Sequence, residues 1–298
     1  MSDLRHLDGS VAGTIGIGGD LPVRRLGYGA MRITGDGIWG PPEDRDGALA
    51  VLRRAVDLGI NLIDTADSYG PDVSEELIRE ALSPYPDDLV IATKGGLERT
   101  GPGEWPRNGR PDHLRAACEG SLRRLGVEQI DLYQLHSPDD KVPYEESVGA
   151  LTELKDEGKI RHIGISNVSL DELRSAQSMT IVVSVQNRYN LTDRDGEDVL
   201  EACEVEGIAF LPWFPLATGE LAGSGGPAAQ IASAQDATPG QVALAWLLQR
   251  SPVILPIPGT AALDHLEENV AAAWVELTAE EFRTLSEAGT QADPEEEG

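Results

Sequence analysis

Four polar side chains at the ends of apolar runs could together carry out acid chemistry: Asp64, Tyr69, Lys94 and His136. A carbonyl that accepts a hydride develops negative charge on its oxygen and needs a proton donor. A phenol with a pKa of about 10 is a weak acid at neutral pH, and a nearby ammonium lowers that pKa. These residue types suggest that Tyr69 donates the proton and Lys94 activates it. Asp64 would anchor the lysine, and His136 would orient the oxygen by a hydrogen bond.

Each of the four residues also has a simpler structural explanation. Asp64 or Lys94 could form an ordinary loop ion pair, Tyr69 could cap a turn, and His136 could be a histidine with satisfied hydrogen bonds. Their placement favours a site, because all four follow three successive apolar runs. The carboxyl ends of neighbouring parallel strands lie close together, so the four side chains are expected to meet.

Short apolar runs alternate with amphipathic stretches along most of the chain. Continuous apolar runs are typical of strands that are buried on both faces. Strands are expected at residues 26–31, 61–64, 89–93, 130–135, 160–165, 182–186, 208–212 and 253–255. Helices are expected at residues 44–58, 74–82, 111–125, 144–157, 170–177, 196–206, 239–249 and 263–272. Eight strand–helix units in 298 residues predict an α/β protein with one closed (β/α)8 TIM barrel.

Two segments flank the expected barrel. A β-hairpin is predicted in the N-terminal region, residues 1–25, with its turn at residues 19–22. An extra C-terminal helix is predicted at residues 278–288, because Thr278 and Glu281 have the spacing of a capping box. The tail at 290–298 is acidic, contains a proline and is expected to be disordered. No linker divides the chain, so residues 1–298 are expected to form a single domain.

A doubly wound nucleotide-binding fold would need a Gly-x-Gly-x-x-Gly turn between its first strand and a helix. Residues 27–32 read Gly-Tyr-Gly-Ala-Met-Arg and lack the third glycine, and residues 16–21 lack it too. Neither segment directly precedes a predicted helix. The sequence therefore argues against a Rossmann site.

The chain is strongly acidic, with a net charge of −27 at pH 7. This charge argues against nucleic acid or an anionic membrane as a partner. A solvated acidic surface is the simple explanation. Adaptation to high salt, where ions screen the self-repulsion, is a second hypothesis. Loss of activity and stability as KCl approaches molar concentration would contradict it.

Other features of the composition are typical of a cytoplasmic protein. No run reaches the roughly 18 apolar residues of a membrane span, and the first residues lack the apolar core of a signal peptide. Cys118 and Cys203 fall on apolar helix faces and are expected to be reduced core residues. No metal site is expected. A small carbonyl compound is the expected partner, and a monomer is slightly favoured over an oligomer.

Three longer segments, at residues 59–70, 158–167 and 257–260, resemble the aldo-keto reductase superfamily. They read Gly-Ile-Asn-Leu-Ile-Asp-Thr-Ala-Asp-Ser-Tyr-Gly, Gly-Lys-Ile-Arg-His-Ile-Gly-Ile-Ser-Asn and Ile-Pro-Gly-Thr. The similarity extends from about residue 26 to residue 269. It implies an NADP(H)-dependent oxidoreductase that reduces aldehydes or ketones to alcohols, with the four catalytic roles given above.

The resemblance also implies that an extended nicotinamide cofactor lies over the barrel rim. Gly29, Ala30 and Met31 would line the floor of the site, and Ser166, Asn167 and Gln186 would bond the carboxamide. Trp213 would stack on the nicotinamide ring, and the pyrophosphate would lie along Leu216, Ala217, Gly219 and Leu221. The adenosine end would be surrounded by Gly259, Thr260, His265, Glu268 and Asn269. Structural alternatives stay open. Ser166 and Asn167 could form the first turn of a helix, Trp213 could be a packing residue, and Glu268 and Asn269 could be exposed helix residues.

Two positions depart from the family pattern. Gly259 stands where the family commonly has lysine, and His265 stands where it commonly has arginine. Histidine is only partly charged at neutral pH, so the expected grip on a 2′-phosphate is weaker. NADP(H) remains the favoured cofactor, because Thr260 and its backbone amide could bind phosphate. Some use of NAD(H) is expected as well.

The substrate would be set by rim loops around Trp39, 97–107 and 138–142. The segments 39–42, 69–71, 85–89 and 241–252 resemble a bacterial branch that includes pyridoxal reductases. Reduction of pyridoxal to pyridoxine is thus one candidate reaction, and reduction of a generic aldehyde is another.

Two other classes of protein are less favoured. A cofactor-binding regulatory subunit, such as the potassium-channel β-subunit, is disfavoured because all four catalytic residues are present. Metal-assisted hydrolysis would need clustered ligands, and only His136 is suitably placed.

Overall fold

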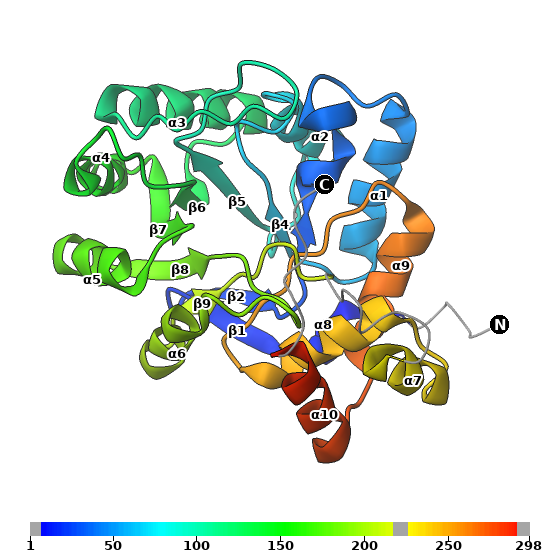
Figure 1. The fold of residues 1–298 in the computed structure, drawn as a ribbon. Coiled ribbons are helices and arrows are strands. Elements are labelled where there is room, and N and C mark those ends of the chain that lie inside the picture. The colour runs from blue at the N-terminus through cyan, green and yellow to red at the C-terminus, as the bar shows by residue number, and fades with distance from the viewer. Residues whose placement is uncertain (1–6, 217–225, 291–298) are drawn as a thin grey trace.

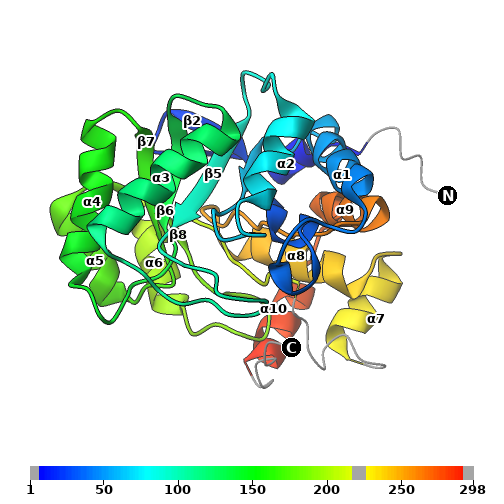
Figure 2. The same ribbon diagram turned by 90° about the horizontal axis from the view of Figure 1, so that it is seen from above.

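The computed structural model describes residues 7–216 and 226–290. Seven parallel strands form one sheet in the order β3-β4-β5-β6-β7-β8-β9, and helices surround it (Figures 1 and 2). The strands are β3 (Tyr28–Gly29), β4 (Leu62–Asp64), β5 (Val90–Gly95), β6 (Ile130–Leu135), β7 (Ile160–Ser166), β8 (Val182–Gln186) and β9 (Ala209–Phe210). Each strand pairs with the next one along the chain, as expected for strands joined by crossover helices.

The barrel closes through the expected eighth strand, but this segment is not a regular strand. Ile254 forms a single parallel bridge with Phe210. On its other side, Pro256 accepts a hydrogen bond from the Gly27 amide at 2.9 Å, and Pro258 accepts one from the Gly29 amide at 3.4 Å. Prolines at 256 and 258 have no N–H to donate, so the ladder cannot be completed. The TIM barrel is confirmed, while the prediction of a strand at 253–255 is wrong in this detail.

The first strand is also shorter than predicted. Residues 26–31 were expected to be extended, but β3 ends at Gly29 and a 3-10 helix, η3 (Ala30–Ile33), follows directly. A second 3-10 turn, η4 (Asp36–Ile38), lies farther along the same loop. The chain therefore bends over the rim immediately after β3.

The described residues contain ten α-helices, and most match the predicted ranges to within two residues at each end. They are α1 (Arg45–Asp57), α2 (Val73–Leu82), α3 (Pro111–Leu125), α4 (Tyr144–Asp156), α5 (Leu170–Met179), α6 (Glu197–Glu206), α7 (Pro227–Ala234), α8 (Pro239–Arg250), α9 (Leu263–Ala271) and α10 (Ala279–Gly289). Local signals set their ends. In α3, Pro111 occupies the first turn, and Gly126 follows the last residue with φ 69°. No helix in the described ranges is long and apolar enough to cross a membrane.

Helix α7 was not predicted, because residues 213–238 were expected to be one long loop. Its sequence does contain a helix signal. Pro227 stands at the first position, and Ala228, Ile231 and Ala232 are buried along one face. The pattern is weak in the sequence because the apolar face consists mainly of alanine.

The predicted hairpin is β1 (Thr14–Ile17) paired with β2 (Leu21–Arg24), and residues 21–22, expected in the turn, belong to β2. Its buried side chains Ile17, Leu21 and Val23 join the cluster that contains inward residues of the barrel strands, such as Leu62 and Leu132. The hairpin therefore packs against the amino-terminal end of the barrel.

The extra C-terminal helix is α10, and its predicted capping box between Thr278 and Glu281 is confirmed. It packs outside the barrel. The Phe282 ring stacks on Trp246 of α8 with centroids 6.0 Å apart, and the Trp246 indole donates to the Ser286 hydroxyl at 2.9 Å. Both cysteines are buried and free, as predicted. The expected disordered tail lies outside the described residues, except for Thr290.

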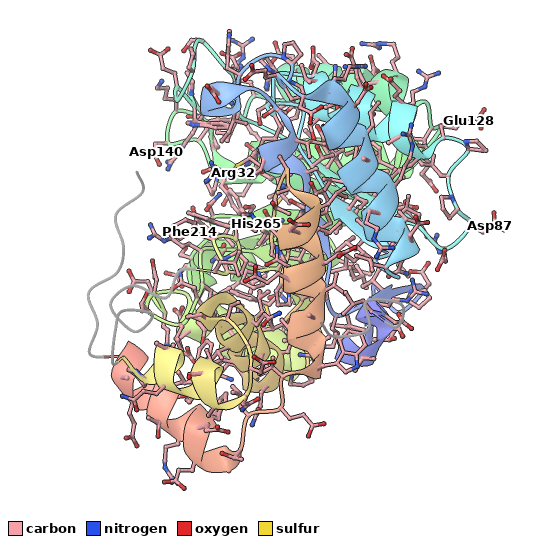
Figure 3. The ribbon with its side chains drawn as sticks, turned by 90° about the vertical axis from the view of Figure 1, so that its right-hand side faces the viewer. Arg32, Asp87, Glu128, Asp140, Phe214 and His265 are labelled. Carbon is pink, nitrogen blue, oxygen red and sulfur yellow. The ribbon has the colours of Figure 1, made fainter. Side chains whose placement is uncertain are left out.

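The two ends of the barrel carry different loops (Figure 3). Asp87 and Glu128, which precede β5 and β6, lie at one end. Arg32, Asp140 and Phe214, which follow β3, β6 and β9, lie at the other end. This second end is the carboxyl-end rim, where barrel enzymes carry their active sites.

Position 259 requires glycine, because its backbone lies very close to that of Gly29 at the seam where the barrel closes. A Cβ at position 259 would lie 2.5 Å from the Gly29 carbonyl oxygen, and one at position 29 would lie 2.6 Å from the Ile257 carbonyl oxygen. Both obstacles are backbone atoms. Gly259→Ala should therefore lower the free energy of unfolding by about 1–3 kcal/mol, as measured by urea titration.

A matched control is Gly240→Ala in α8. There the added Cβ would meet side chains no closer than 3.5 Å, and alanine favours helix over glycine. This variant should be as stable as the unmodified protein or slightly more stable. Equal stability of both variants would show that the seam is not as tight as described.

Candidate active site

A buried ion pair lies at the centre of the carboxyl-end rim. Asp64 is the last residue of β4, and Lys94 lies within β5 rather than just past it as predicted. The Lys94 ammonium donates to Asp64 Oδ2 at 2.6 Å and to the Thr65 carbonyl oxygen at 2.9 Å. The two side chains are 0% and 3% exposed. A charge this deeply buried needs such partners, because water cannot reach it.

Tyr69 and His136 complete the group that the sequence predicted. The Tyr69 hydroxyl lies 3.4 Å from Lys94 Nζ, and that nitrogen lies 5.1 Å from the centre of the phenol ring. The His136 ring packs edge-on against Tyr69, with centroids 5.9 Å apart. Its Nδ1 lies 3.4 Å from the Ser68 hydroxyl. All four predicted side chains thus lie together in one buried cluster.

Two glutamines support the ion pair, a role that the sequence alone does not assign. Gln134 of β6 and Gln186 of β8 donate to Asp64 Oδ1 at 3.1 and 2.8 Å. Both oxygens of the carboxylate therefore accept hydrogen bonds, which fixes its orientation. Gln134 stands as a polar residue within the apolar run 130–135, and this was the signal that could have revealed it.

Burial decides the protonation states of the cluster. Burial raises the pKa of Tyr69, and the opposing effect of Lys94 is smaller, so the net shift is upward. Lys94 itself lowers the pKa of Tyr69, as expected, but burial outweighs this contribution. Burial works against the charge of Lys94, but Asp64 and Tyr69 outweigh it and raise its pKa. Burial, assisted by Lys94, holds the pKa of His136 well below its usual range.

The side chains predicted for the nicotinamide carboxamide adjoin this cluster. Asn167 follows β7 with φ 57° and donates to the His136 carbonyl oxygen at 2.9 Å. The Trp213 indole donates to Asn167 Oδ1 at 3.0 Å. Ser166 pairs with Gln186 in the register of β7 and β8. The alternative that Ser166 and Asn167 start a helix is wrong, because α5 begins at Leu170 with Ser169 as its cap.

The residues predicted for the adenosine end lie just before α9 and within it. Thr260 accepts a hydrogen bond from the Tyr28 hydroxyl at its carbonyl oxygen and one from the Ala262 amide at its side chain, at 2.5 and 3.0 Å. His265 is exposed on α9. Glu268 accepts from the Thr238 hydroxyl at 2.5 Å, and Asn269 is buried.

These contacts exclude the view of Glu268 and Asn269 as plain exposed helix residues. Of the remaining predicted positions, Ala30 is buried, while Met31 and Leu216 are half-buried. Ala217, Gly219 and Leu221 lie outside the described residues.

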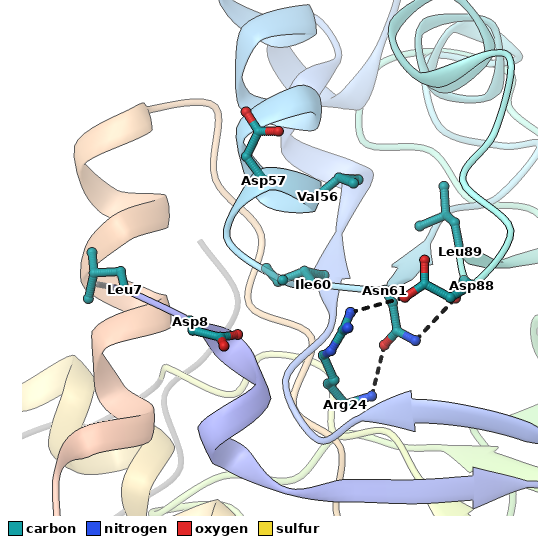
Figure 4. A pocket seen from close by; sticks show the side chains of 10 residues that line it. Leu7, Asp8, Arg24, Val56, Asp57, Ile60, Asn61, Asp88 and Leu89 are labelled. Atoms are coloured by element: carbon teal, nitrogen blue, oxygen red, sulfur yellow. Dashed lines mark hydrogen bonds and ion pairs between the residues drawn. The ribbon is translucent and has the colours of Figure 1, made fainter. Parts of the chain in front are cut away.

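A cavity of about 520 Å³ lies away from this cluster, at the amino-terminal end of the barrel (Figure 4). Among its lining residues, Asn61 directly precedes β4 and bonds the Arg24 amide and the Pro22 and Asp88 carbonyls at 2.8–3.1 Å. Arg24 pairs with Asp88 at 3.4 Å. These polar groups bind each other and tie the hairpin to the barrel. TIM barrels carry their active sites at the other end, so this cavity belongs to the structural end of the barrel.

In residues 7–216 and 226–290, no group of three or more histidine, cysteine, aspartate or glutamate side chains is arranged to hold a metal ion. The cluster of Asp64, Tyr69, Lys94 and His136 is instead suited to moving a proton and stabilising an oxygen that gains charge.

Comparison with known proteins agrees with this geometry. An uncharacterized oxidoreductase of Schizosaccharomyces pombe is 54% identical over 287 residues, which are 96% of this chain and 93% of that protein. Pyridoxine 4-dehydrogenase of Escherichia coli is 43% identical over 274 residues, which are 90% of this chain and 95% of the enzyme. An aldo-keto reductase from Klebsiella pneumoniae, solved in complex with NADPH, has a TM-score of 0.79 at 29% identity and covers 95% of this chain and 96% of its own. Residues 25–290 match the Aldo/keto reductase family, and the chain belongs to that family.

Proposed function

We propose that this chain reduces aldehydes or ketones to alcohols with NADPH, and that pyridoxal is a candidate substrate beside simple aldehydes. One observation carries the proposal: the Tyr69 hydroxyl lies 3.4 Å from an ammonium, Lys94, that is itself held by Asp64 at 2.6 Å. The Klebsiella structure in complex with NADPH supports the cofactor. The E. coli relative named pyridoxine 4-dehydrogenase supports pyridoxal.

The geometry of the cluster suggests a separate catalytic role for each of its four residues. NADPH, when bound, supplies the hydride that is added to the carbonyl carbon. Tyr69 gives its hydroxyl proton to the carbonyl oxygen, and the Lys94 ammonium stabilises the phenolate that remains. Asp64 keeps Lys94 charged and in place. His136, neutral because of its burial, can donate one N–H to the same oxygen.

The donor set beside the cluster suits a nicotinamide. Its carboxamide needs both a hydrogen-bond donor and an acceptor, and the Ser166 hydroxyl with the Asn167 and Gln186 amides supplies both kinds. Gln186 also holds Asp64, so its role toward the carboxamide stays a prediction. Trp213 offers a flat surface for stacking, and its indole bond to Asn167 fixes the ring.

The test is a spectrophotometric assay with the purified protein. It should oxidise NADPH in the presence of pyridoxal or of at least one aldehyde in a broad panel, and it should bind NADPH more tightly than NADH. If it binds NADPH but reduces no carbonyl compound in the panel, the cofactor-binding regulatory subunit becomes the better account. Equal affinity for the two cofactors would contradict the preference for NADPH.

The rate of reduction should change little between about pH 7 and pH 9. Burial raises the pKa of Tyr69 above its ordinary value of 10.0, so the phenol keeps its proton throughout this range. Burial lowers the pKa of His136 well below 6.5, so the imidazole stays neutral. We expect kcat/KM for one aldehyde, measured in half-unit steps of pH, to be nearly constant. An inflection inside this range would mean that one of these groups titrates there.

A further inference from the structure

Arg99 fastens three segments of the rim together beside Tyr69. Its guanidinium donates to the carbonyl oxygens of Gly37 at 2.9 Å and Ile38 at 2.8 Å, in the loop after β3. It also donates to the Ser68 carbonyl at 3.1 Å, one residue before Tyr69, and to the Gly101 carbonyl at 3.3 Å, in its own loop. A guanidinium is suited to this role, because its rigid fork of donors can reach several acceptors at once.

The same guanidinium packs against two tryptophans. Its central carbon lies 3.6 Å from the ring centroid of Trp105 and 5.6 Å from that of Trp39. A cation over an indole face is attracted by the ring quadrupole. Arg99 therefore holds both side chains as well as the loops that carry them.

Both tryptophans adjoin the proton donor. The Trp105 ring meets Tyr69 edge to face, with centroids 6.3 Å apart and an interplanar angle of 86°. Trp39 forms a parallel bridge with Gly70, the residue after Tyr69, and Trp39 as a whole is 36% exposed. A carbonyl oxygen that receives the Tyr69 proton must lie within hydrogen-bond distance of this hydroxyl. The rest of such a substrate then lies close to the surface formed by Trp39 and Trp105.

We propose that Trp39 and Trp105 form one wall of the substrate site and favour flat aromatic carbonyl compounds, and that Arg99 is the positioning residue that holds this wall. The inference rests on the proposed function, because it assumes that Tyr69 is the acid. Aromatic rings prefer edge-to-face or offset contacts with one another, so an aromatic substrate gains from this wall more than a saturated ring of similar size. Pyridoxal, an aromatic aldehyde, belongs to the class that such a wall would accept.

The test compares benzaldehyde with cyclohexanecarbaldehyde, two aldehydes of similar size that differ in aromaticity. The readout is the ratio of their kcat/KM values, because a change in this ratio between variants does not depend on their intrinsic reactivities. Trp105→Leu should lower the ratio about tenfold, mainly through a higher KM for benzaldehyde, while Trp105→Phe should keep most of it. The control Trp274→Leu, at an exposed tryptophan in η6 (Ala272–Trp274), should leave the ratio unchanged.

Arg99→Ala should lower the ratio about as much as Trp105→Leu does. If Arg99 acts through Trp105, the double variant should show little further change, because the two effects are not additive. Arg110→Ala removes an exposed arginine that pairs with Asp112 and should leave the ratio unchanged. NADPH affinity and melting temperature, measured for every variant, show whether it is folded.

The outcomes separate the two claims. An unchanged ratio in a folded, active Trp105→Leu variant would overturn the proposed wall and leave the proposed function standing. Additive losses in the double variant would overturn the positioning role of Arg99. Absence of turnover of both aldehydes by the unmodified protein, together with the rest of the panel, would overturn the proposed function and this inference with it.

Discussion

Tyr69→Phe is expected to lower kcat for carbonyl reduction by roughly 10²–10⁴-fold, the usual contribution of a positioned general acid. The substitution removes only the hydroxyl, while the ring keeps its edge contacts with Trp105 and His136. NADPH affinity should therefore stay within about twofold of the unmodified protein. Single-turnover kinetics with saturating NADPH would measure the chemical step, and fluorescence titration would measure the binding.

The matched control is Tyr144→Phe at the start of α4. The Tyr144 hydroxyl is buried and has no hydrogen-bond partner in the described structure, so its removal should cause no loss of stability or rate. A Tyr69→Phe variant that keeps more than about a tenth of the rate would show that another group protonates the substrate.

Lys94→Met is expected to have the second largest effect, because it removes activity and also leaves a charge buried without its partner. The Asp64 side chain is 3% exposed and would keep only the hydrogen bonds from Gln134 and Gln186. Breaking a buried pair in this way typically lowers the free energy of unfolding by about 3–5 kcal/mol. Urea titration near pH 7 measures the effect. Since the pKa of Lys94 is raised in the folded protein, the pair is intact at this pH and weakens only above the ordinary lysine range.

A double variant distinguishes the charge from the packing. Asp64→Asn combined with Lys94→Met removes both charges, so most of the lost stability should return, while activity should not. The expected pattern is thus a stable but inactive double variant beside an unstable single variant. Equal stability of the single and double variants would mean that the Asp64 charge is not left without compensation.

The sequence predicted the elements that the structure contains because their signals are local. Pro111 and Gly126 limit α3, and the pair of Thr278 and Glu281 starts α10. Apolar runs located the strands, and the position of Asp64 at the end of one was correct. Helix α7 was missed since its buried face is mostly alanine, and the eighth strand was overestimated because prolines interrupt its ladder.

The four-residue cluster could be predicted because strand order alone brings the ends of β4, β5 and β6 together. The balance between burial and charge could not. The net direction of the Tyr69 pKa depends on how completely the ring is enclosed, which no spacing in the sequence reveals. The second role of Gln186 was hidden for a similar reason: its contact with Asp64 crosses the barrel, between residues 122 positions apart.

For the rim beside the cluster, the sequence predicts only which loops set the substrate and not how they are held together. The loops around Trp39 and at residues 97–107 were expected to set the substrate, but the sequence does not indicate that Arg99 joins them. Its hydrogen-bond acceptors are backbone carbonyls in three segments. Carbonyl groups exist at every residue, so their arrangement leaves no mark on the sequence.

The most direct test of the central claim follows the hydride itself. The protein is supplied with an aldehyde and with NADPH carrying deuterium at one face of the nicotinamide C4, in two separate preparations, one for each face. We predict that one preparation yields alcohol with a single deuterium on the former carbonyl carbon, detected by mass spectrometry, and that the other yields unlabelled alcohol. Alcohol that carries no deuterium in both preparations, or no alcohol although NADPH is bound, would contradict carbonyl reduction by hydride transfer from NADPH.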